Sequence, residues 1–263
     1  MKDNKFLVMG KDEKMLSCCR RLNELGLSAE CCEACNGDKK ISDFENIVLP
    51  LPTVANGCIS GTAVGFDDFC AVLDKSQTVF CGNVSCKRFP CKAFSYYTDE
   101  GFLIKNSRLT AQGVLRIVLE NTEKDLHSMA AAVTGYGHCG REICRLLKKC
   151  GAEVTSFSRR SQTRVLAEND GVKADKIENI NRRIKEFNLT VNTVPCNIIN
   201  SGLGGMSREN LYIEIASKPY GFNIADTDKY NFRYILAESL PGRFTPVSAG
   251  INIADTVYSL TGE

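Results

Sequence analysis

Residues 129–160, MAAAVTGYGHCGREICRLLKKCGAEVTSFSRR, decide the fold. A short apolar run at Ala131–Val133 leads into a complete G-x-G-x-x-G turn at Gly135–Gly140. Apolar residues with helical spacing follow from Ile143 to Cys150, and a second strand is expected at Glu153–Phe157. This order of strand, turn, helix and strand is the opening unit of a dinucleotide-binding domain. In that unit the helix N-terminus directs its unpaired N–H groups at a pyrophosphate.

The residues of the turn have separate expected roles. Gly135 allows the tight turn, Gly137 lets the backbone approach a pyrophosphate, and Gly140 allows close packing of helix against strand. His138 and Cys139 complete the turn, and we expect all five residues to contribute to cofactor binding. Packing is an alternative role for Cys139. A glycine turn in an unrelated α/β protein is the alternative interpretation of the motif.

The end of the second strand indicates which dinucleotide is bound. An NAD site usually carries Asp or Glu about 20 residues further on, where it binds the ribose 2′-hydroxyl. Here the chain reads Ser158-Arg159-Arg160-Ser161, without an acid. Two guanidiniums and two hydroxyls suit a 2′-phosphate, which Arg can bind in a fork. The sequence therefore predicts NADP(H), with a solvated basic turn as the alternative.

Composition limits the partners and the compartment. The 263 residues include 33 basic and 31 acidic ones, so no global charge attracts nucleic acid or an anionic membrane. No apolar run approaches the roughly 18 residues that span a bilayer, and the first residues lack the pattern of a signal peptide. We therefore expect a soluble cytoplasmic protein.

Fourteen cysteines are many for such a chain. A C-x-x-C spacing runs from Cys32 to Cys35, but no second Cys or His pair with zinc spacing lies near it, and the chain has only 2 histidines. Most other thiols occupy helix-face positions typical of small apolar residues. We expect a reducing cytosol and no metal site.

The first hundred or so residues alternate strands and helices, which predicts a parallel sheet. Strands are expected at 5–10, 27–31, 46–51 and 78–82, and helices at 15–25 and 66–73. Ligands of open α/β sheets bind outside the carboxyl ends of strands. The loop after the third strand, Leu51–Gly57, lies there, which makes Thr53 and Asn56 candidate substrate contacts. An ordinary proline turn is the alternative.

Residues 107–124 read as a long helix, capped by Ser107 or Thr110, that joins two domains. The second domain continues with a helix near 178–187 and with strands near 189–194, 211–216 and 234–237, which lead into loops at 195–197, 217–221 and 240–246. A last helix, 248–263, could pack back on the first domain. The sequence thus predicts an α/β fold of two Rossmann-like domains with parallel sheets, residues 1–106 and 125–247, and a cleft between them.

These loops carry a resemblance. The motifs LTAQG, LHS, GYGHCGREI, VNTVP, IEIASKPYG and LPGRFTPVSAG begin at residues 109, 126, 135, 191, 213 and 240. In this order they are similar to the motifs of the family of dipicolinate synthase A subunits over most of residues 100–260. His138 and Tyr220 depart from that family's motifs, which usually carry Arg and Gly at these positions.

The resemblance implies NADP-linked oxidation of dihydrodipicolinate to dipicolinate, in the mother-cell cytoplasm of a sporulating bacterium. It also implies a second, flavoprotein-like chain as partner, the B subunit of dipicolinate synthase, while a homo-oligomer stays open. Thr193, Val194 and Pro195 lie at the end of a predicted strand, on the edge that holds the glycine turn, so we count them as cofactor contacts.

The product of this reaction carries two carboxylates, so its site must neutralise a dianion. Lys218 and Arg243 are cations in the predicted edge loops, and Ser217, like Thr53 and Asn56, could add neutral hydrogen bonds. Lys218 could serve as the catalytic base only if it is buried. Solvated loop charges are the alternative for both cations.

Three functions stay open at this stage. The chain could catalyse hydride transfer in its own site, or it could be a non-catalytic subunit that carries NADP(H) for a partner or regulates it. The absence of an obvious acid–base set keeps this second function open. A stand-alone NADP dehydrogenase of the 2-hydroxyacid or shikimate type is a third, against which the missing Arg–Glu–His set of the former argues.

Overall fold

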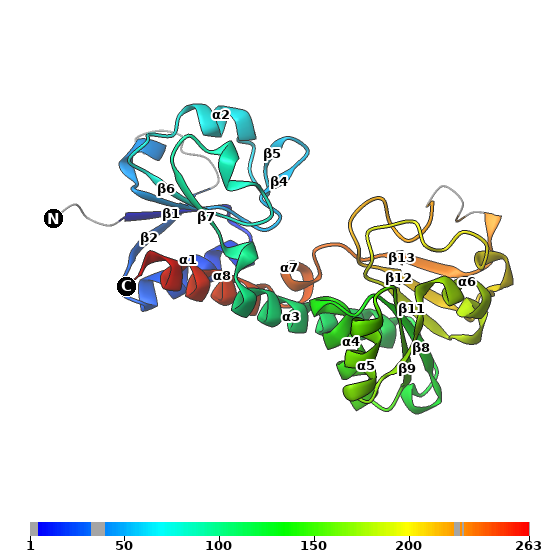
Figure 1. Cartoon of the computed structure of the whole chain (residues 1–263). Coiled ribbons are helices and arrows are strands. Elements are labelled where there is room, and N and C mark those ends of the chain that lie inside the picture. Colours follow the sequence, from blue (N-terminus) through cyan, green and yellow to red (C-terminus); the bar gives the residue numbers. More distant parts are fainter. Residues whose placement is uncertain (1–4, 33–39, 224–226, 228, 263) are drawn as a thin grey trace. The chain divides into compact units, whose positions relative to one another are not determined.

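The computed structural model describes residues 5–32, 40–223, 227 and 229–262. The chain forms two compact units. Unit 1 comprises residues 1–106 and 241–263, and unit 2 comprises residues 107–240. Each is an α/β structure with helices around a parallel sheet, as predicted (Figure 1).

The sheet of unit 1 has five parallel strands in the order β2-β1-β3-β6-β7. They are β1 (Lys5–Met9), β2 (Ser28–Cys32), β3 (Asn46–Val48), β6 (Thr78–Cys81) and β7 (Lys92–Ser95). Sequence analysis expects the first four. It misses β7 because this edge strand is short and at most half-buried, so it lacks an apolar run.

Helices cover both faces of this sheet. Phe6 and Val8 of β1 pack with α1 (Glu13–Glu24) and α8 (Pro246–Thr261), whereas Leu7 and Met9 pack on the opposite face with α2 (Phe66–Ala71). Side chains alternate between faces along a strand, and all four are buried, as a covered parallel sheet requires.

The C-terminal helix α8 lies beside α1 in unit 1 (Figure 1). The two backbones touch at Gly250, where an added Cβ would lie 2.1 Å from the Lys14 carbonyl oxygen. The chain therefore leaves unit 1 after residue 106 and returns to it at residue 241. The short helix α7 (Leu240–Phe244) spans the point of return.

A small hairpin follows β3. Strands β4 (Val54–Ala55) and β5 (Cys58–Ile59) pair antiparallel around Asn56 and Gly57, whose φ angles are 51° and 80°. Two successive left-handed residues make the type I′ turn that Asn-Gly favours. Sequence analysis treats this segment as an irregular loop and so misses the hairpin.

The sheet of unit 2 has six parallel strands in the order β10-β9-β8-β11-β12-β13. They are β8 (Ala130–Thr134), β9 (Glu153–Ser158), β10 (Lys173–Lys176), β11 (Leu189–Asn192), β12 (Leu211–Glu214) and β13 (Arg233–Leu236). Counted from β8, this is the 3-2-1-4-5-6 order of dinucleotide-binding domains, which reverses direction between β8 and β11. The strand β10 and the helix before it, α5 (Ser161–Asn169), are absent from the sequence prediction.

Two helix predictions need correction. The long helix α3 (Glu100–Glu120) begins seven residues before Ser107, because the Asp99 carboxylate accepts the Phe102 N–H at 2.7 Å and caps it. Ser107 and Thr110 are therefore interior residues and not caps. The helix expected at 178–187 is a short α6 (Ile180–Arg183) between two 3₁₀ turns. None of the helices in the described ranges is long and apolar enough to cross a membrane.

Candidate functional site

Two glycines of the turn after β8 are required by the packing of unit 2 itself. Gly135 has a φ of 86°, and a Cβ on it would lie 2.5 Å from Thr193 Oγ1. A Cβ on Gly140 would lie 2.3 Å from the Gly135 carbonyl oxygen. Both distances are shorter than side-chain atoms tolerate. Because neither residue has a side chain, the turn can pack closely against the loop at Thr193, and the start of the following helix can pack against Gly135.

Gly137 is different, because nothing in the described part of the protein requires it to be glycine. Its φ of −81° suits any residue, and no atom lies within 4 Å of the place where a Cβ would stand. It is also the N-cap of α4 (His138–Lys149), and it supplies no side-chain hydrogen bond to the helix. The turn thus leaves an open space in front of uncapped N–H groups. A pyrophosphate that approaches the backbone would use this space.

The other predicted cofactor residues differ in their contacts with this turn. Thr193 donates its hydroxyl to the Thr134 carbonyl at 2.7 Å, which places the Thr193–Pro195 loop directly against Gly135. His138 is exposed at the start of α4. The Cys139 thiol instead lies 3.5 Å from the Ser107 hydroxyl of α3, so packing against α3 is its observed role.

A charged cluster braces the turn from the side. The Tyr136 hydroxyl donates to Asp170 Oδ2 at 2.8 Å, and Arg141 Nε donates to the same oxygen at 2.7 Å. Arg141, followed by Tyr136, lowers the pKa of Asp170 to about 2. Sequence analysis misses this cluster because Asp170 follows α5, an element that it does not predict.

The end of β9 carries the predicted phosphate-binding residues. Arg159 and Arg160 are exposed, and neither guanidinium bonds to another residue in the described ranges. Ser158 is buried and its hydroxyl has no hydrogen-bond partner among the described residues. Arg164 donates to the carbonyls of Ser158 and Arg159, at 3.0 and 2.9 Å, and so supports the backbone there. The two exposed guanidiniums, the Ser158 hydroxyl and Ser161 at the start of α5 fit a 2′-phosphate.

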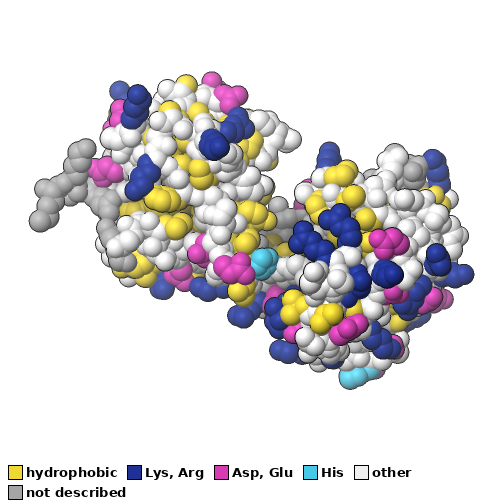
Figure 2. Space-filling model, in the orientation of Figure 1, with side chains coloured by type: hydrophobic (Ala, Val, Ile, Leu, Met, Phe, Trp, Pro, Cys, Tyr) yellow, Lys and Arg dark blue, Asp and Glu magenta, His cyan; other side chains and the backbone are white. Residues whose placement is uncertain are grey.

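Side chains of both charges lie on the face of unit 2 that carries α4 and α5 (Figure 2). On α4, Arg141 and Arg145 pair with Asp170 at 2.7 and 3.4 Å. Arg145 also pairs with Glu142 at 3.1 Å. Because these guanidiniums are neutralised locally, they are poorer candidates for a phosphate than Arg159 and Arg160.

A buried polar network joins the carboxyl ends of β11 and β12. Glu214 is fully buried and accepts hydrogen bonds from Asn192 Nδ2 at 2.8 Å, from the Gly221 N–H at 2.8 Å and from the Ala216 N–H at 3.0 Å. Asn192 Oδ1 accepts the Val194 N–H at 3.1 Å. The network therefore fixes two edge loops together.

Burial raises the pKa of Glu214, while its hydrogen-bond donors act in the opposite direction. Its oxygens face these donors and not solvent, so it positions loops and is not a base open to a ligand. Sequence analysis does not single it out. An acid inside the otherwise apolar run Leu211–Ala216 was the available signal.

The loop that this network supports carries two predicted substrate residues. Ser217 and Lys218 are exposed. Because Lys218 is not buried, the condition set for a catalytic base is not met, and we retain it only as a candidate carboxylate contact. Tyr220 has a φ of 60°, a region that favours glycine, and its hydroxyl donates to Glu238 at 3.2 Å.

Two predicted substrate residues lie in unit 1, and the structure corrects the prediction for Thr53. Thr53 is fully buried, donates to the Pro50 carbonyl at 2.9 Å and accepts the Gly82 N–H at 2.8 Å, so its hydroxyl supports the loop. Asn56 is exposed at the hairpin tip, where its side chain permits the left-handed turn. Neither arrangement indicates a substrate contact.

Arg243 also lies elsewhere than expected. It is an exposed residue of α7 in unit 1, not a loop residue of the second domain. Its guanidinium carbon lies 5.0 Å from the centre of the Phe244 ring. The predicted domain boundary at residue 247 fails for the same reason, because the chain has already returned to unit 1 at residue 241.

In the described part of the chain, no group of three or more His, Cys, Asp or Glu side chains could hold a metal ion. Cys35, the second cysteine of the C-x-x-C spacing, lies outside the described residues. Cys32 ends β2 and is half-buried.

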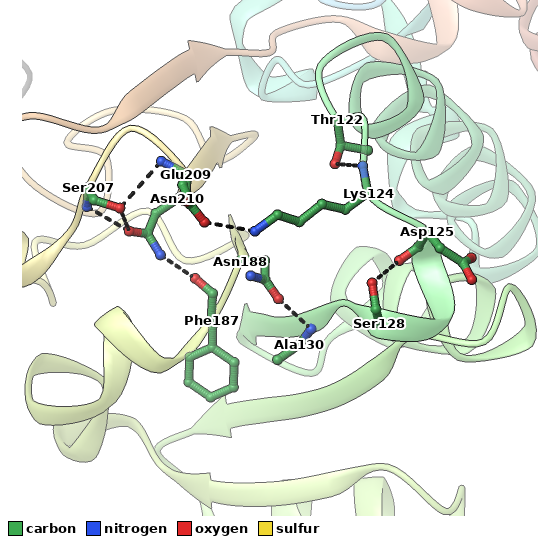
Figure 3. A network of polar contacts seen from close by, with 10 residues as sticks. All are labelled: Thr122, Lys124, Asp125, Ser128, Ala130, Phe187, Asn188, Ser207, Glu209 and Asn210. Carbon is green, nitrogen blue, oxygen red and sulfur yellow. Dashed lines mark hydrogen bonds and ion pairs between the residues drawn. The ribbon is translucent and has the colours of Figure 1, made fainter.

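Unit 2 also contains a cavity of about 690 Å³ at the opposite, amino edge of its sheet. Its lining includes Met129, Asn188 and Leu211, at or before the starts of strands, and the Lys124–Glu209 ion pair of 2.8 Å (Figure 3). Asn188 accepts the Ala130 N–H at 2.9 Å and thereby ties two strand starts together. Ligands of parallel sheets bind at the carboxyl edge, so this cavity is not the candidate site.

Comparison with known proteins supports the fold described above. No family model matches the chain. The A subunit of dipicolinate synthase from Bacillus subtilis is 22% identical over 286 residues, which span 98% of this chain and 96% of the relative. The chain is similar to this dipicolinate synthase subunit. The similarity confirms the resemblance that the sequence motifs indicate.

Solved structures show the same fold. The crystal structure of the Bacillus subtilis dipicolinate synthase subunit superposes with a TM-score of 0.84 and 22% identity, over 100% of this chain and 97% of the other. Its counterpart from Bacillus halodurans gives 0.86 and 21%, over 99% and 98%. D-lactate dehydrogenase from Lactobacillus jensenii, solved with NAD⁺, gives 0.58 and 11%, over 98% and 97%. The chain therefore has the fold of the nicotinamide-dependent dehydrogenases.

Proposed function

We propose that this chain is the NADP-dependent subunit of an oxidoreductase that oxidises dihydrodipicolinate to dipicolinate. The observation that carries the proposal is Gly137, a glycine that the protein's own packing does not require, in front of the uncapped N-terminus of α4. The similarity to the relative named dipicolinate synthase supports the proposed substrate and product.

The choice of NADP over NAD rests on the end of β9. Arg159 and Arg160 are exposed guanidiniums without partners among the described residues, and no acid stands among Ser158–Ser161 to accept a ribose hydroxyl. A doubly charged 2′-phosphate would satisfy both guanidiniums. It would also offer an acceptor to the buried Ser158 hydroxyl.

A dinucleotide held at this turn would supply the hydride acceptor for oxidation of the dihydropyridine ring of the substrate. One proton leaves the substrate as its ring becomes aromatic. Since Lys218 is exposed and Glu214 is enclosed by donors, neither is arranged as a base, and we assign the proton to solvent. The contribution of this chain is then to bind and orient the two reactants.

The carboxylates of the substrate need cations. Lys218 in unit 2 and Arg243 in unit 1 are exposed, and each is a candidate contact in its own unit. The Asn192–Glu214 network fixes the loop that carries Lys218, because Glu214 accepts the N–H of Gly221 at the end of this loop. We further propose the B subunit of dipicolinate synthase as partner, by analogy with the relative, whose name makes it the A subunit of its enzyme.

A second candidate function is a subunit that carries NADP(H) without itself binding the substrate. The absence of a base among the described edge residues favours it. The two functions differ in where dipicolinate binds, and this can be measured.

The test is a calorimetric titration of dipicolinate into the NADP⁺-saturated chain, alone and with the B subunit. If the chain is catalytic, dipicolinate binds the lone chain, and Lys218→Ala and Arg243→Ala, made separately, show which cation contacts it. A lost charge-assisted contact weakens binding by roughly 10- to 150-fold. NADP⁺ affinity should hardly change. Binding that requires the B subunit, with both variants harmless, would assign the substrate to the partner and leave this chain as the carrier.

A further inference from the structure

Lys14 is a cation at the carboxyl edge of the unit 1 sheet. It is the second residue of α1, and its Nζ donates to the Leu51 carbonyl at 2.6 Å. Leu51 follows the end of β3 by three residues. The ammonium group therefore lies where an open α/β sheet binds its ligands. Sequence analysis does not select Lys14, because it considers only the apolar residues of this helix.

Lys14 forms no ion pair with a described residue of unit 1, although the negative charge of nearby Asp12 acts against the effect of burial on its pKa. The side chain is half-buried, and burial lowers its pKa. No acidic group of the described residues lies within ion-pair distance, and the nearby Asp12 carboxylate caps α1 by accepting the Met15 N–H at 2.9 Å. Only one of the three ammonium donors is used within these residues. A half-buried ammonium group with two such donors can bind an anionic ligand.

The short helix α7 packs next to this ammonium group. Gly242 of α7 lies next to it, and a Cβ on Gly242 would stand 3.8 Å from Lys14 Nζ. The next residue is Arg243, which is exposed. The return of the chain to unit 1 thus brings Gly242 next to the lysine, with Arg243 as the following residue.

We propose that Lys14 binds one carboxylate of the pyridine dicarboxylate. This rests on the proposed function, and it names a substrate contact within unit 1. The ammonium group keeps its hydrogen bond to the Leu51 carbonyl and directs its remaining donors to the ligand. Its role is binding and orientation, and no proton transfer is assigned to it.

The experiment compares two ligands on one variant. Pyridine-2,6-dicarboxylate and pyridine-2-carboxylate are titrated separately into the NADP⁺-saturated full chain, with the B subunit present. Lys14→Met should weaken binding of the dicarboxylate by roughly 10- to 150-fold. The monocarboxylate, which can use the remaining anion site, should lose much less. Lys14→Arg should keep more of the affinity than Lys14→Met, because the charge remains.

Lys75→Met is the matched control. Lys75 is an exposed lysine of unit 1 that precedes β6, at the amino edge of the same sheet. This variant should bind both ligands as the unmodified chain does. NADP⁺ titration of every variant reports whether unit 2 is intact.

The outcomes separate the two claims. If the unmodified chain binds the dicarboxylate and Lys14→Met binds it equally well, the assignment of Lys14 is wrong and the proposed function stands. If Lys14→Met weakens both ligands equally, the lysine only supports the Leu51 loop, which also overturns the assignment. If the unmodified chain together with its partner binds no dicarboxylate, both the proposed function and this inference fail.

Discussion

The first turns of the two units have the same topology and opposite chemistry. In unit 1, β1 leads through Gly10 to α1, whose N-terminus is capped by the Asp12 carboxylate and followed by Glu13. In unit 2, β8 leads through Gly135 to α4, whose N-terminus is Gly137, with no side-chain cap and no acid in the first turn. A side chain satisfies one of the first N–H groups of α1, whereas no side chain caps α4.

The two turns are also held in place differently. The acid that caps α1 repels a phosphate and fixes the helix at the same time. The uncapped turn of unit 2 is instead braced from the side by Tyr136, Asp170 and Arg141. The N-terminus of α4 thus has no side-chain cap, and the turn before it is held by contacts of its flanking residues with Asp170.

The largest effect on NADP⁺ affinity is expected when the N-cap of α4 in unit 2 becomes an aspartate, the residue that caps α1 in unit 1. Gly137→Asp places a carboxylate at the N-cap, where it should repel the pyrophosphate and weaken NADP⁺ binding by about 100-fold or more. Stability should change by only a few tenths of a kcal/mol, because Gly137 has an ordinary φ and free space around it. Calorimetry and thermal unfolding measure the two effects.

Two neighbouring variants serve as controls for this result. Gly137→Ala adds volume without charge and should weaken NADP⁺ binding less. Gly140→Ala should instead destabilise the fold, by about 1–3 kcal/mol, because its Cβ meets the Gly135 carbonyl. NADP⁺ binding by Gly137→Asp at unmodified affinity would mean that the turn is only structural.

A smaller effect is expected at the end of β9. Replacing both Arg159 and Arg160 with alanine should lower NADP⁺ affinity by about tenfold or more, which is about 1.4 kcal/mol. NAD⁺ affinity should be nearly unchanged, because only the 2′-phosphate is recognised there. Arg182→Ala removes another exposed arginine of unit 2 and should alter neither affinity. Equal losses for both dinucleotides would show a general electrostatic effect.

The smallest effect is expected on stability, at the contacts of Asp170 with Tyr136 and Arg141 that hold the glycine turn. Asp170→Asn should lower stability by about 1 kcal/mol at neutral pH, since the cluster is partly exposed and screened. The folded pKa of about 2 lies below the ordinary value of 3.8, so the carboxylate stabilises the fold above 3.8 and loses this contribution as the pH falls through 2. Thermal midpoints of both proteins should therefore converge in acid. A difference that is the same at pH 7 and in acid would contradict this assignment.

The local sequence pattern is sufficient to predict most of the fold. The strand at β8, the glycine turn and the apolar face of α4 are all encoded within residues 129–150, and their order alone predicts a dinucleotide unit. The elements that were missed, such as β7 and β10, are short and at most half-buried, so they have no apolar run to mark them. The Asn56-Gly57 hairpin had a clear turn signal that was not used.

The site was less predictable, because burial and long-range contacts decide it. Thr53 and Lys218 have suitable side chains for a substrate, but only the structure shows that the first is enclosed and the second exposed. Arg243 was assigned to the wrong unit because nothing local marks the return of the chain at residue 241. Lys14 and Glu214 depend on partners 37 and 22 residues away.

The central claim is that unit 2 binds NADP(H) at its uncapped glycine turn, and binding to the unmodified chain tests it most directly. NADP⁺ and NAD⁺ are titrated separately into the 263-residue chain by calorimetry. We predict that NADP⁺ binds at one site per chain, about tenfold or more tightly than NAD⁺. Equal affinities, or no binding of either dinucleotide, would contradict the claim.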